Sequence, residues 1–596
     1  MIMFPKPDPE SFFLTVRIGD FAVSHDEDQL IYSTNLNGKF NIWGMDLPNH
    51  SPYQMTSINQ YCHHLSFEKE GRFILTSFDQ DGDENSQIYA LSRNGGALVP
   101  LCSEKSARHL APILSNDGER VYYTSNKKNK SYLSSFVYHI STKEDQLLLD
   151  GEHTTTYLTA VSPDESHFVY LKQFSSTNIN FFLHSNDEKF TILPKTEQEY
   201  TVGDVIFTSN QTMYFTTNFD ADVSYLMKYN LKRKQYSKIA HIEGYEMKHL
   251  QWEEKSNRLY VYGSSGVRSR VFQLDLDEEE INEVVIPVTS ITKFLVGNRG
   301  NCYILGSTDT RPDNIYMLPK EGTEWKEITN HQVIGASRKI FVESEVVHYP
   351  SFDGLMIEGL YYRSKSEVEN GYTIVWPHGG PQFHEQQQFK SFIQLATSKG
   401  YNFFQPNFRG STGYGLSFSK MVEKDWGYGP RLDIVHGIEW LAASGRSDLN
   451  KIFLLGASYG GYMSLLLHGR HPEYFQAIVD ICGPSNLFSF INSVPDFWKP
   501  FLESMIGHPE KDKEKLIEDS PITYLKSMKK PMLIIQGAND PSVVKEESDQ
   551  IVERLWEYGR EVEYIILEDE GHGINKKANE IKVFKRIFDF FQENQK

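Results

Sequence analysis

The sequence predicts two domains, a seven-bladed β-propeller over residues 1–335 and an α/β domain with a doubly wound, mostly parallel sheet over residues 336–596. Two observations support this prediction. A pattern of polar turn and β-rich strand recurs through the first half at intervals of 43 to 48 residues, the length of one four-stranded blade. From about residue 340, short apolar strands alternate instead with amphipathic helical segments, which is typical of an α/β sheet.

Each copy of the first-half repeat consists of a polar turn and a run rich in β-branched and aromatic residues, and a second short strand follows it. No segment of 20–330 keeps a helical period, so strands separated by Asp, Asn and Gly turns are the simplest interpretation. Seven blades that close into a ring protect their strand edges. Rings of six or eight blades are the alternatives. The copies lie at 21–34, 65–77, 112–125, 159–172, 205–218, 250–263 and 294–306.

Two acidic turns of the repeat have alternative interpretations. DQDGDEN at 79–85 is superficially like a calcium loop, but Gly82 is its fourth residue where an EF-hand requires glycine at position 6, and Ala90 replaces the bidentate Glu. A tight blade turn is therefore favoured over a metal site. The run LDEEEINE at 276–283 is most simply a solvated loop, with a carboxylate that anchors a substrate amine as the alternative.

The composition excludes several classes of function. With 60 Lys and Arg against 79 Asp and Glu, the net charge of −19 disfavours nucleic-acid and membrane-surface binding. No apolar run could span a bilayer and no signal peptide begins the chain, so we expect a cytoplasmic protein. GxGxxG, GxxxxGK[ST] and HExxH are absent, so we expect no cofactor and no metal. We expect buried, reduced thiols at the four scattered cysteines, Cys62, Cys102, Cys302 and Cys482.

The second half contains six candidate strands and five candidate helices in alternation, enough for a core of its own. The strands are expected at 372–377, 401–407, 452–456, 477–482, 532–537 and 562–567, and the helices at 389–400, 430–444, 460–469, 545–559 and 580–594.

Three residues of this half form a catalytic pattern. GASYG at 456–460 joins a strand to a helix, and its glycines leave room for the sharp turn that exposes a nucleophile at Ser458. Asp540 and His572 each follow a later strand, so all three are expected at the carboxyl edge of the sheet. The order Ser, Asp, His is that of the α/β-hydrolase fold, which we therefore expect for this domain.

These residue types predict hydrolysis through an acyl-enzyme. His572 takes the Ser458 proton and returns it to the leaving group, while Asp540 orients the imidazole and stabilises its charged form. The oxyanion needs at least two donors. We expect the backbone N–H groups of Tyr459, directly after the nucleophile, and of Gly380, in the HGGP turn at 378–381; HGGP as a mere tight turn is the alternative.

The chain resembles the prolyl oligopeptidase family of serine peptidases, most of all its acylaminoacyl-peptidase and dipeptidyl-aminopeptidase-like branch. The resemblance implies a peptidase for short peptides, a serine at the interface of the two domains, and a propeller that restricts substrate size. It rests on the propeller order and on HGGP, NFRGSTGYG (407–415), DWG (425–427), GASYGGYM (456–463), GANDPSV (537–543) and DEGHG (569–573).

Two departures from the family pattern affect the expected specificity. Prolyl oligopeptidase and dipeptidyl peptidase IV are known for a tyrosine at the position of His378, where its hydroxyl completes the oxyanion hole. This chain has His378 at that position, as acylaminoacyl peptidases do. The resemblance therefore implies that the second oxyanion donor is the backbone N–H of Gly380. The Glu pair that holds a free amino terminus in dipeptidyl peptidase IV has no identifiable counterpart, so strict release of dipeptides is not implied.

Candidate substrate-binding residues lie between the nucleophile helix and the acid. Phe488, Phe497 and Trp498, in the aromatic-rich segment 482–507, fit an apolar pocket for the side chain before the scissile bond, with core packing as the alternative. Arg409 fits a ligand for a substrate carbonyl or carboxylate, or else a structural ion pair.

Three functions compete on the sequence. The first is a serine peptidase for short, free or N-acylated peptides, and the second is an esterase or amidase that uses the same triad on small acyl compounds. The third is a propeller-based binding protein with a degenerate hydrolase domain, which the intact motifs disfavour. The sequence does not decide the oligomeric state, which is either a monomer or a homo-oligomer.

Overall fold

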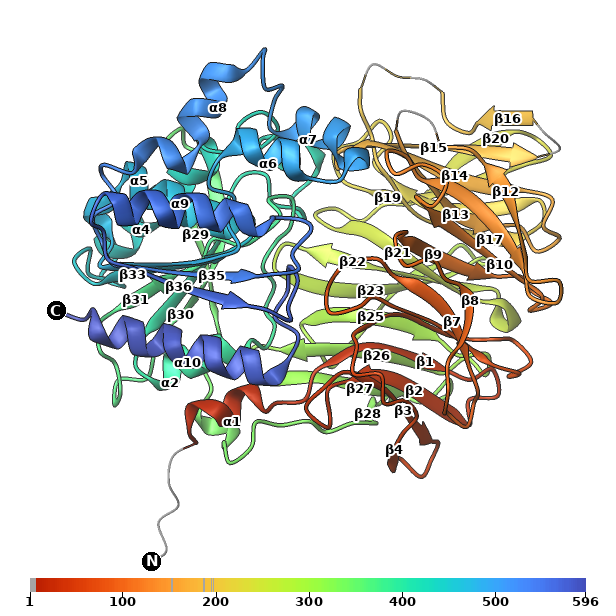
Figure 1. Cartoon of the computed structure of the whole chain (residues 1–596). Helices are drawn as coiled ribbons and strands as arrows, with labels where there is room; N and C mark the ends of the chain where they lie inside the picture. The colour runs from red at the N-terminus through yellow and green to blue at the C-terminus, as the bar shows by residue number, and fades with distance from the viewer. Residues whose placement is uncertain (1–6, 152–153, 186–187, 195, 197) are drawn as a thin grey trace, which may run out of the picture.

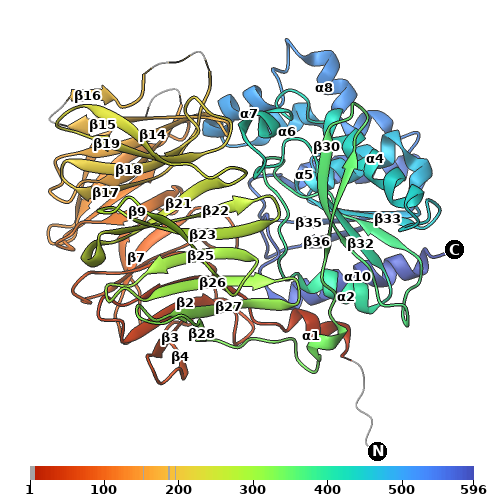
Figure 2. The same cartoon turned by 180° about the vertical axis from the view of Figure 1, so that it is seen from behind.

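The chain folds into two bodies that lie side by side, a ring of β-sheets and a layered α/β domain (Figure 1). Figure 2 shows the same two bodies from behind. This computed structural model describes residues 7–151, 154–185, 188–194, 196 and 198–596.

The ring contains seven antiparallel sheets of four strands, and the strands of every sheet pair in chain order. The predicted seven-bladed propeller is therefore confirmed. Blades one to four contain β1 (Ile18–Val23), β2 (Gln29–Thr34), β3 (Asn41–Asp46), β4 (Pro52–Gln54), β5 (Cys62–Phe67), β6 (Ile74–Phe78), β7 (Gln87–Leu91), β8 (Val99–Cys102), β9 (His109–Leu114), β10 (Arg120–Ser125), β11 (Ser134–His139), β12 (Glu144–Leu149), β13 (Thr155–Val161), β14 (Phe168–Ser175), β15 (Asn178–Ser185) and β16 (Glu188–Thr191). Blades five to seven contain β17 (Val202–Ser209), β18 (Thr212–Thr217), β19 (Tyr225–Asn230), β20 (Gln235–Ala240), β21 (Glu246–Glu253), β22 (Arg258–Ser265), β23 (Arg268–Asp275), β24 (Ile281–Val284), β25 (Ser290–Val296), β26 (Cys302–Thr308), β27 (Arg311–Leu318) and β28 (Lys326–Glu327).

Burial follows the position of each strand within its blade. All six residues of the second strand β2 are buried, whereas the outermost strand β20 exposes its first four residues. The second strand packs against neighbouring blades on both faces, which explains the consecutive apolar residues Leu30, Ile31 and Tyr32. Among the described residues, a separate apolar cluster fills each contact between neighbouring blades, including the one that joins blade seven to blade one.

The ring closes without exchange of strands, because blades one and seven each consist of four consecutive strands. Polar contacts join these two blades beside their apolar cluster. Lys293 Nζ lies 2.6 Å from Asp20 Oδ1, and the Tyr303 hydroxyl donates to Glu27 at 2.9 Å.

The α/β domain is built on one sheet of eight strands, in the order β29-β30-β32-β31-β33-β34-β35-β36. The first three strands pair antiparallel, and the pairs from β32 onward are parallel. The strands are β29 (Glu345–Pro350), β30 (Met356–Tyr362), β31 (Thr373–Val375), β32 (Asn402–Asn407), β33 (Ile452–Ala457), β34 (Ala477–Ile481), β35 (Met532–Gly537) and β36 (Val562–Leu567). The six predicted strands are present, and the antiparallel pair β29 and β30 was missed.

Helices cover both faces of this sheet (Figure 1). One apolar core joins the sheet to α4, α5 and α9, and a second joins it to α2 and α10. The α-helices are α1 (Pro9–Phe13), α2 (Ser391–Ser398), α3 (Leu416–Lys420), α4 (Gly429–Ala443), α5 (Tyr459–Arg470), α6 (Leu487–Ser493), α7 (Lys499–Met505), α8 (Lys513–Asp519), α9 (Lys545–Glu557) and α10 (Lys577–Glu593). Short 3₁₀ helices are η1 (Glu254–Ser256), η2 (Arg338–Ile340), η3 (Pro472–Tyr474), η4 (Asp496–Trp498) and η5 (Pro521–Tyr524).

The helix α1 precedes the propeller in sequence but packs against α2 and α10 of the α/β domain. The Phe13 ring stacks on Phe584 with centroids 5.0 Å apart, and both rings are buried. The segment before the first blade therefore ties the start of the propeller to the second domain. In the described part of the chain, no helix combines the length and apolar composition needed to cross a bilayer.

Candidate active site

Ser458 lies in the sharp turn between β33 and α5, as the glycine pattern predicted. Its backbone has φ 57° and ψ −123°, a left-handed conformation that is rare for a residue with a side chain. A Cβ on Gly456 would clash with the Gly460 carbonyl, and one on Gly460 would clash with the Pro377 carbonyl. Glycine at both positions therefore lets the turn close around the serine.

The structure brings Ser458, His572 and Asp540 into one hydrogen-bonded chain. Ser458 Oγ lies 3.0 Å from His572 Nε2, and His572 Nδ1 lies 2.7 Å from Asp540 Oδ2. Asp540 is buried, and its Oδ1 accepts the N–H groups of Ser542 and Val543 at 2.9 Å each. These two backbone bonds leave the other oxygen directed at the imidazole.

The surroundings of His572 act on its charge in opposite directions. Burial disfavours the imidazolium, but the Cys482 sulfur and the Asp540 carboxylate favour it and together raise the pKa of His572 well above 6.5. The arrangement thus favours the positively charged form of the His572 ring.

The HGGP turn packs directly against Ser458. A Cβ on Gly379 would lie 3.6 Å from Ser458 Cβ, and Gly380, at φ 121°, lines the cavity that contains Ser458. Tyr459 begins α5 directly after the serine, and its own ring points away from the cavity, where the hydroxyl donates to the Trp426 carbonyl at 2.6 Å. Tyr459 therefore follows Ser458 directly in the chain, and Gly380 lines the same cavity as Ser458.

His378 supports this turn and has no nitrogen left for a substrate. Its ring stacks on Phe408 at a centroid distance of 4.1 Å. Nδ1 lies 2.7 Å from the Gly379 oxygen and Nε2 lies 2.8 Å from Ser411 Oγ. Burial lowers the pKa of His378 to about 4, so the ring is uncharged at neutral pH.

A cavity of about 520 Å³ lies over Ser458, with walls from both domains. The propeller provides a mainly polar wall of Glu84, Thr155, Tyr157, Gln173 and Ser176, and the α/β domain provides an apolar wall of Trp426, Phe490, Trp498, Phe501, Leu502, Met505 and Val543. The Glu84 carboxylate accepts from Ser542 Oγ at 3.0 Å and pairs with Arg108.

The predicted substrate-binding residues have different positions. Trp498 lines the cavity, whereas Phe488 packs half-buried against the apolar core and is not in the cavity wall. The Phe497 side chain lies outside the described part of the structure. The sequence missed Phe490, Phe501 and other wall residues of the same segment, because its aromatic content alone does not indicate which rings face the cavity.

Arg409 forms a structural ion pair, which corrects its assignment to substrate binding. Its guanidinium bonds Asp433 at 2.7 Å and Asp353 at 2.9 Å, and the side chain is buried away from the cavity wall. The two carboxylates use the donors that a substrate would need. The carboxylates raise the pKa of Arg409 further above its ordinary value against the effect of burial.

The acidic loop 79–85 of blade two docks on the two loops that carry Asp540 and His572. A Cβ on Gly82 would lie 2.7 Å from the Gly571 nitrogen, so only glycine permits this contact. Asp81 pairs with Lys576 at 2.9 Å. The loop thus forms an interdomain contact, whereas the acidic run 276–283 is mostly exposed and leads into β24, the outermost strand of blade six.

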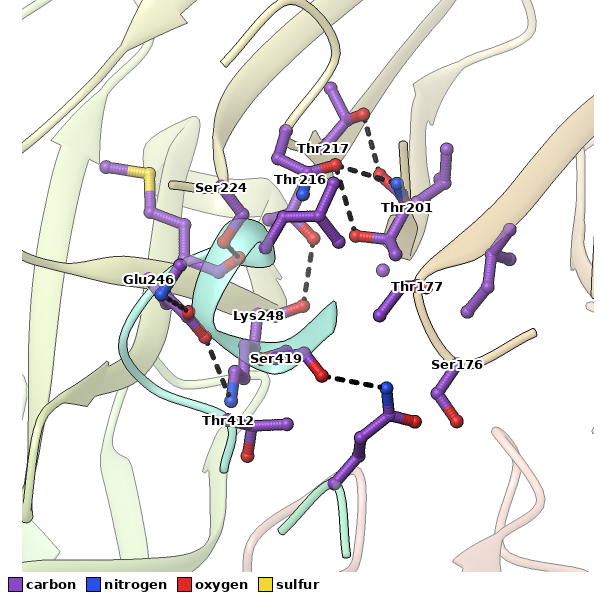
Figure 3. Close-up of a pocket in the computed structure, with 18 of the residues that line it drawn as sticks. Ser176, Thr177, Thr201, Thr216, Thr217, Ser224, Glu246, Lys248, Thr412 and Ser419 are labelled. Carbon is purple, nitrogen blue, oxygen red and sulfur yellow. Dashed lines mark hydrogen bonds and ion pairs between the residues drawn. The ribbon is translucent and has the colours of Figure 1, made fainter. Parts of the chain in front are cut away.

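A second cavity of about 410 Å³ adjoins the first, between blades four to six and α3 (Figure 3). Hydroxyl-bearing side chains line this cavity, among them Thr201, Thr216 and Thr217, and Glu246 and Lys248 line it as well (Figure 3). Gln173, Ser176 and Gln382 line both cavities, which indicates that the polar space is an extension of the space over Ser458.

Comparisons with known proteins agree with this geometry. Residues 387–596 match the prolyl oligopeptidase family, described as Peptidase_S9. Dipeptidyl peptidase family member 6 of Caenorhabditis elegans is 25% identical over 87% of this chain and 77% of its own length. Dipeptidyl aminopeptidase BIII of Pseudoxanthomonas mexicana is 36% identical over 37% of this chain and 32% of its own length.

The whole fold also has a counterpart among solved structures. The acylaminoacyl peptidase of Pyrococcus horikoshii superposes with a TM-score of 0.74 at 18% identity, over 99% of this chain and 98% of that one. The predicted order of propeller and α/β-hydrolase domain is therefore confirmed, and so is the resemblance drawn from the motifs. The chain is a serine hydrolase that carries a prolyl oligopeptidase family domain at residues 387–596.

Proposed function

We propose that the protein is a serine peptidase that hydrolyses short peptides, free or N-acylated, with Ser458, His572 and Asp540 as its catalytic triad. The observation that carries the proposal is the continuous chain of hydrogen bonds from Ser458 Oγ through both ring nitrogens of His572 to Asp540. This chain ends in a cavity large enough for several residues of a peptide.

The reaction follows from the positions of these groups. His572 Nε2 accepts the Ser458 proton as Oγ attacks the scissile carbonyl, and the imidazolium then protonates the leaving amine. A water molecule, deprotonated by the same nitrogen, cleaves the acyl-enzyme. Asp540 holds the ring with its proton on Nδ1, so that Nε2 faces the serine as an acceptor.

The N–H groups of Tyr459 and Gly380 stabilise the tetrahedral oxyanion in this proposal. They belong to the first turn of α5 and to the HGGP turn, which meet beside Ser458. The α5 N-terminus adds a favourable partial positive charge there. Loss of one such donor typically reduces kcat by about 10² to 10³.

The propeller restricts the size of the substrate, because the cavity over Ser458 has walls from both domains. A folded protein cannot insert a peptide bond between them. The apolar wall of Trp426, Phe490, Trp498 and Phe501 suits a large apolar or aromatic residue before the scissile bond.

The proposal is tested with chromogenic substrates and the Ser458→Ala variant. The panel contains N-acetylated Ala, Leu and Phe, the same residues with free amino groups, Gly-Pro and Ala-Ala dipeptides, and a short-chain ester. We expect turnover of the peptide-like amides by the wild type and by Ser51→Ala, a control at an exposed serine, and none by Ser458→Ala. Efficient ester cleavage with negligible amide cleavage would make the protein an esterase instead.

A further inference from the structure

Cys482 lies directly against His572, although it has no role in the proposed peptidase reaction. It follows β34 and has φ 46°, a left-handed conformation that is unusual for cysteine. Its backbone N–H donates to the Ile535 carbonyl at 2.8 Å, which fixes it beside β35. The side chain is buried, and Sγ lies 3.8 Å from the His572 carbonyl oxygen.

The Cys482 sulfur, a ring nitrogen of His572 and a carboxylate oxygen of Asp540 all lie within 4.8 Å of one another. Sulfur, imidazole nitrogen and carboxylate oxygen are the ligands that zinc takes in proteins, at roughly 2.0 to 2.3 Å each. A tetrahedral ion with these bonds separates its ligand atoms by about 3 to 4 Å. The three side chains therefore need only small adjustments to share one ion.

We propose that Cys482, His572 and Asp540 form a binding site for a thiophilic divalent cation such as Zn²⁺, which switches the hydrolase off. The ion reaches the site through the cavity, because His572 lines the cavity wall and its side chain is 29% exposed. The single carboxylate and the soft sulfur do not suit Ca²⁺ or Mg²⁺, which prefer six or more oxygen ligands or several bound waters.

Bound cation takes the place of the proton between His572 Nδ1 and Asp540 Oδ2. The Cys482 thiol releases one proton to solvent and binds as thiolate, while the single proton of the neutral imidazole moves from Nδ1, where the ion now binds, to Nε2. A protonated Nε2 cannot accept the Ser458 proton, so the nucleophile is no longer activated. The substrate cavity itself stays open, so inhibition lowers kcat without competing with substrate.

The site has the outer support that metal ligands require. Asp540 Oδ1 is held by two backbone N–H groups, which orients the carboxylate independently of His572. Cys482 is held by its own backbone bond between two strands. Two of the three ligands are thus preorganised before the ion arrives.

The inhibitory consequence rests on the proposed function, but binding does not, and two experiments separate them. In the first, zinc is titrated into the full-length enzyme in metal-free buffer, with turnover of the best substrate as readout. We expect noncompetitive inhibition, reversed by a chelator and absent with Ca²⁺ or Mg²⁺. Cys482→Ser should raise the half-inhibitory zinc concentration by roughly tenfold or more, and Cys302→Ala, a buried cysteine of blade seven, should not.

In the second, Cd²⁺ is titrated into the Ser458→Ala protein, and the ultraviolet absorption of the cadmium–thiolate bond is recorded. We expect one cadmium per chain, with the band kept in the Cys302→Ala background and lost in Cys482→Ser. Cys482→Gly, which suits the left-handed backbone, provides a second variant if the serine protein does not fold. A band unaffected by either Cys482 substitution, or equal zinc sensitivity of the wild type and Cys482→Ser, would overturn the proposal.

Discussion

The propeller and the α/β domain bury their apolar surface in different ways. In the propeller, strands pair in chain order and each pair of neighbouring blades has a cluster of its own. Contacts therefore stay local in sequence, except where blade seven closes the ring on blade one. In the α/β domain, β31 lies between β32 and β33, and two extended cores unite segments from β29 to α10.

This difference explains where the three residues of the proposed triad come together. A parallel sheet brings the carboxyl ends of β33, β35 and β36 to one edge, so Ser458, Asp540 and His572 meet although they are far apart in sequence. A blade offers no such convergence, because its strands alternate in direction. The propeller instead contributes walls and a supporting loop. The predictions below test this division, from the largest expected effect to the smallest.

Removal of the nucleophile should produce the largest loss. We expect Ser458→Ala to reduce kcat by about a million-fold, because the proton acceptor is left without a nucleophile to activate. The measurements are turnover of the best amide substrate and labelling by a fluorophosphonate. Persistent labelling at another serine would show that the α/β edge is not the reactive site.

Asp540→Asn should have the next largest effect, a fall of about 10⁴ in kcat, because the amide favours the wrong imidazole tautomer. Loss of the carboxylate should also lower the pKa of His572, which Asp540 helps to raise. The ring must be neutral to accept a proton, so wild-type kcat/KM should fall as the pH drops through this raised pKa. The residual activity of Asp540→Asn should fall only at lower pH, and an unshifted profile would contradict the assignment.

Gly82→Ala tests whether the propeller supports His572 of the proposed triad. The added methyl group would press on Gly571, next to His572, and a displacement of this kind can cost about 10² in rate. We expect kcat to fall with little change in KM.

Gly38→Ala is the matched control for this change. Gly38 also has a left-handed backbone, at φ 93°, but open space around its missing Cβ. The control should therefore keep its activity while it bears the same backbone strain. Equal loss of activity in both variants would mean that strain within the blade, and not the interdomain contact, is responsible.

The smallest effect concerns stability at low pH. His468 is buried in α5, and burial lowers its pKa to about 3. Its folded pKa lies below the unfolded value near 6.5, so the unfolded chain binds more protons as the pH falls below 6.5. The free energy of unfolding should then decrease by up to about 1.4 kcal/mol per pH unit from this group.

Urea unfolding at a series of pH values measures this dependence. His468→Gln, which can still accept the Lys530 N–H that Nε2 accepts at 3.1 Å, should reduce the slope between pH 6.5 and 4. His50→Gln, at an exposed position, should leave the slope unchanged. Equal slopes for all three proteins would contradict the prediction.

Much of the fold could be predicted from the sequence because its signals are local. The turn and strand pattern repeats within each blade, and all six strands of the parallel region were found. The strands β29 and β30 were missed because they precede the alternation of strand and helix and pair antiparallel. The helix α1 packs on α2 and α10 because of two phenylalanines whose partners follow hundreds of residues later.

The sequence by itself determined the seven blades and the identity of Ser458, Asp540 and His572 as residues at strand ends, since periodicity and glycine spacing are properties of neighbouring residues. Only the tertiary structure decided that Arg409 is held by Asp433 and Asp353, that Gly82 contacts Gly571, and that Cys482 lies beside His572. Contacts of this kind join segments that are distant in the chain. They depend on how the sheet and the blades pack together, and no local pattern of residues encodes them.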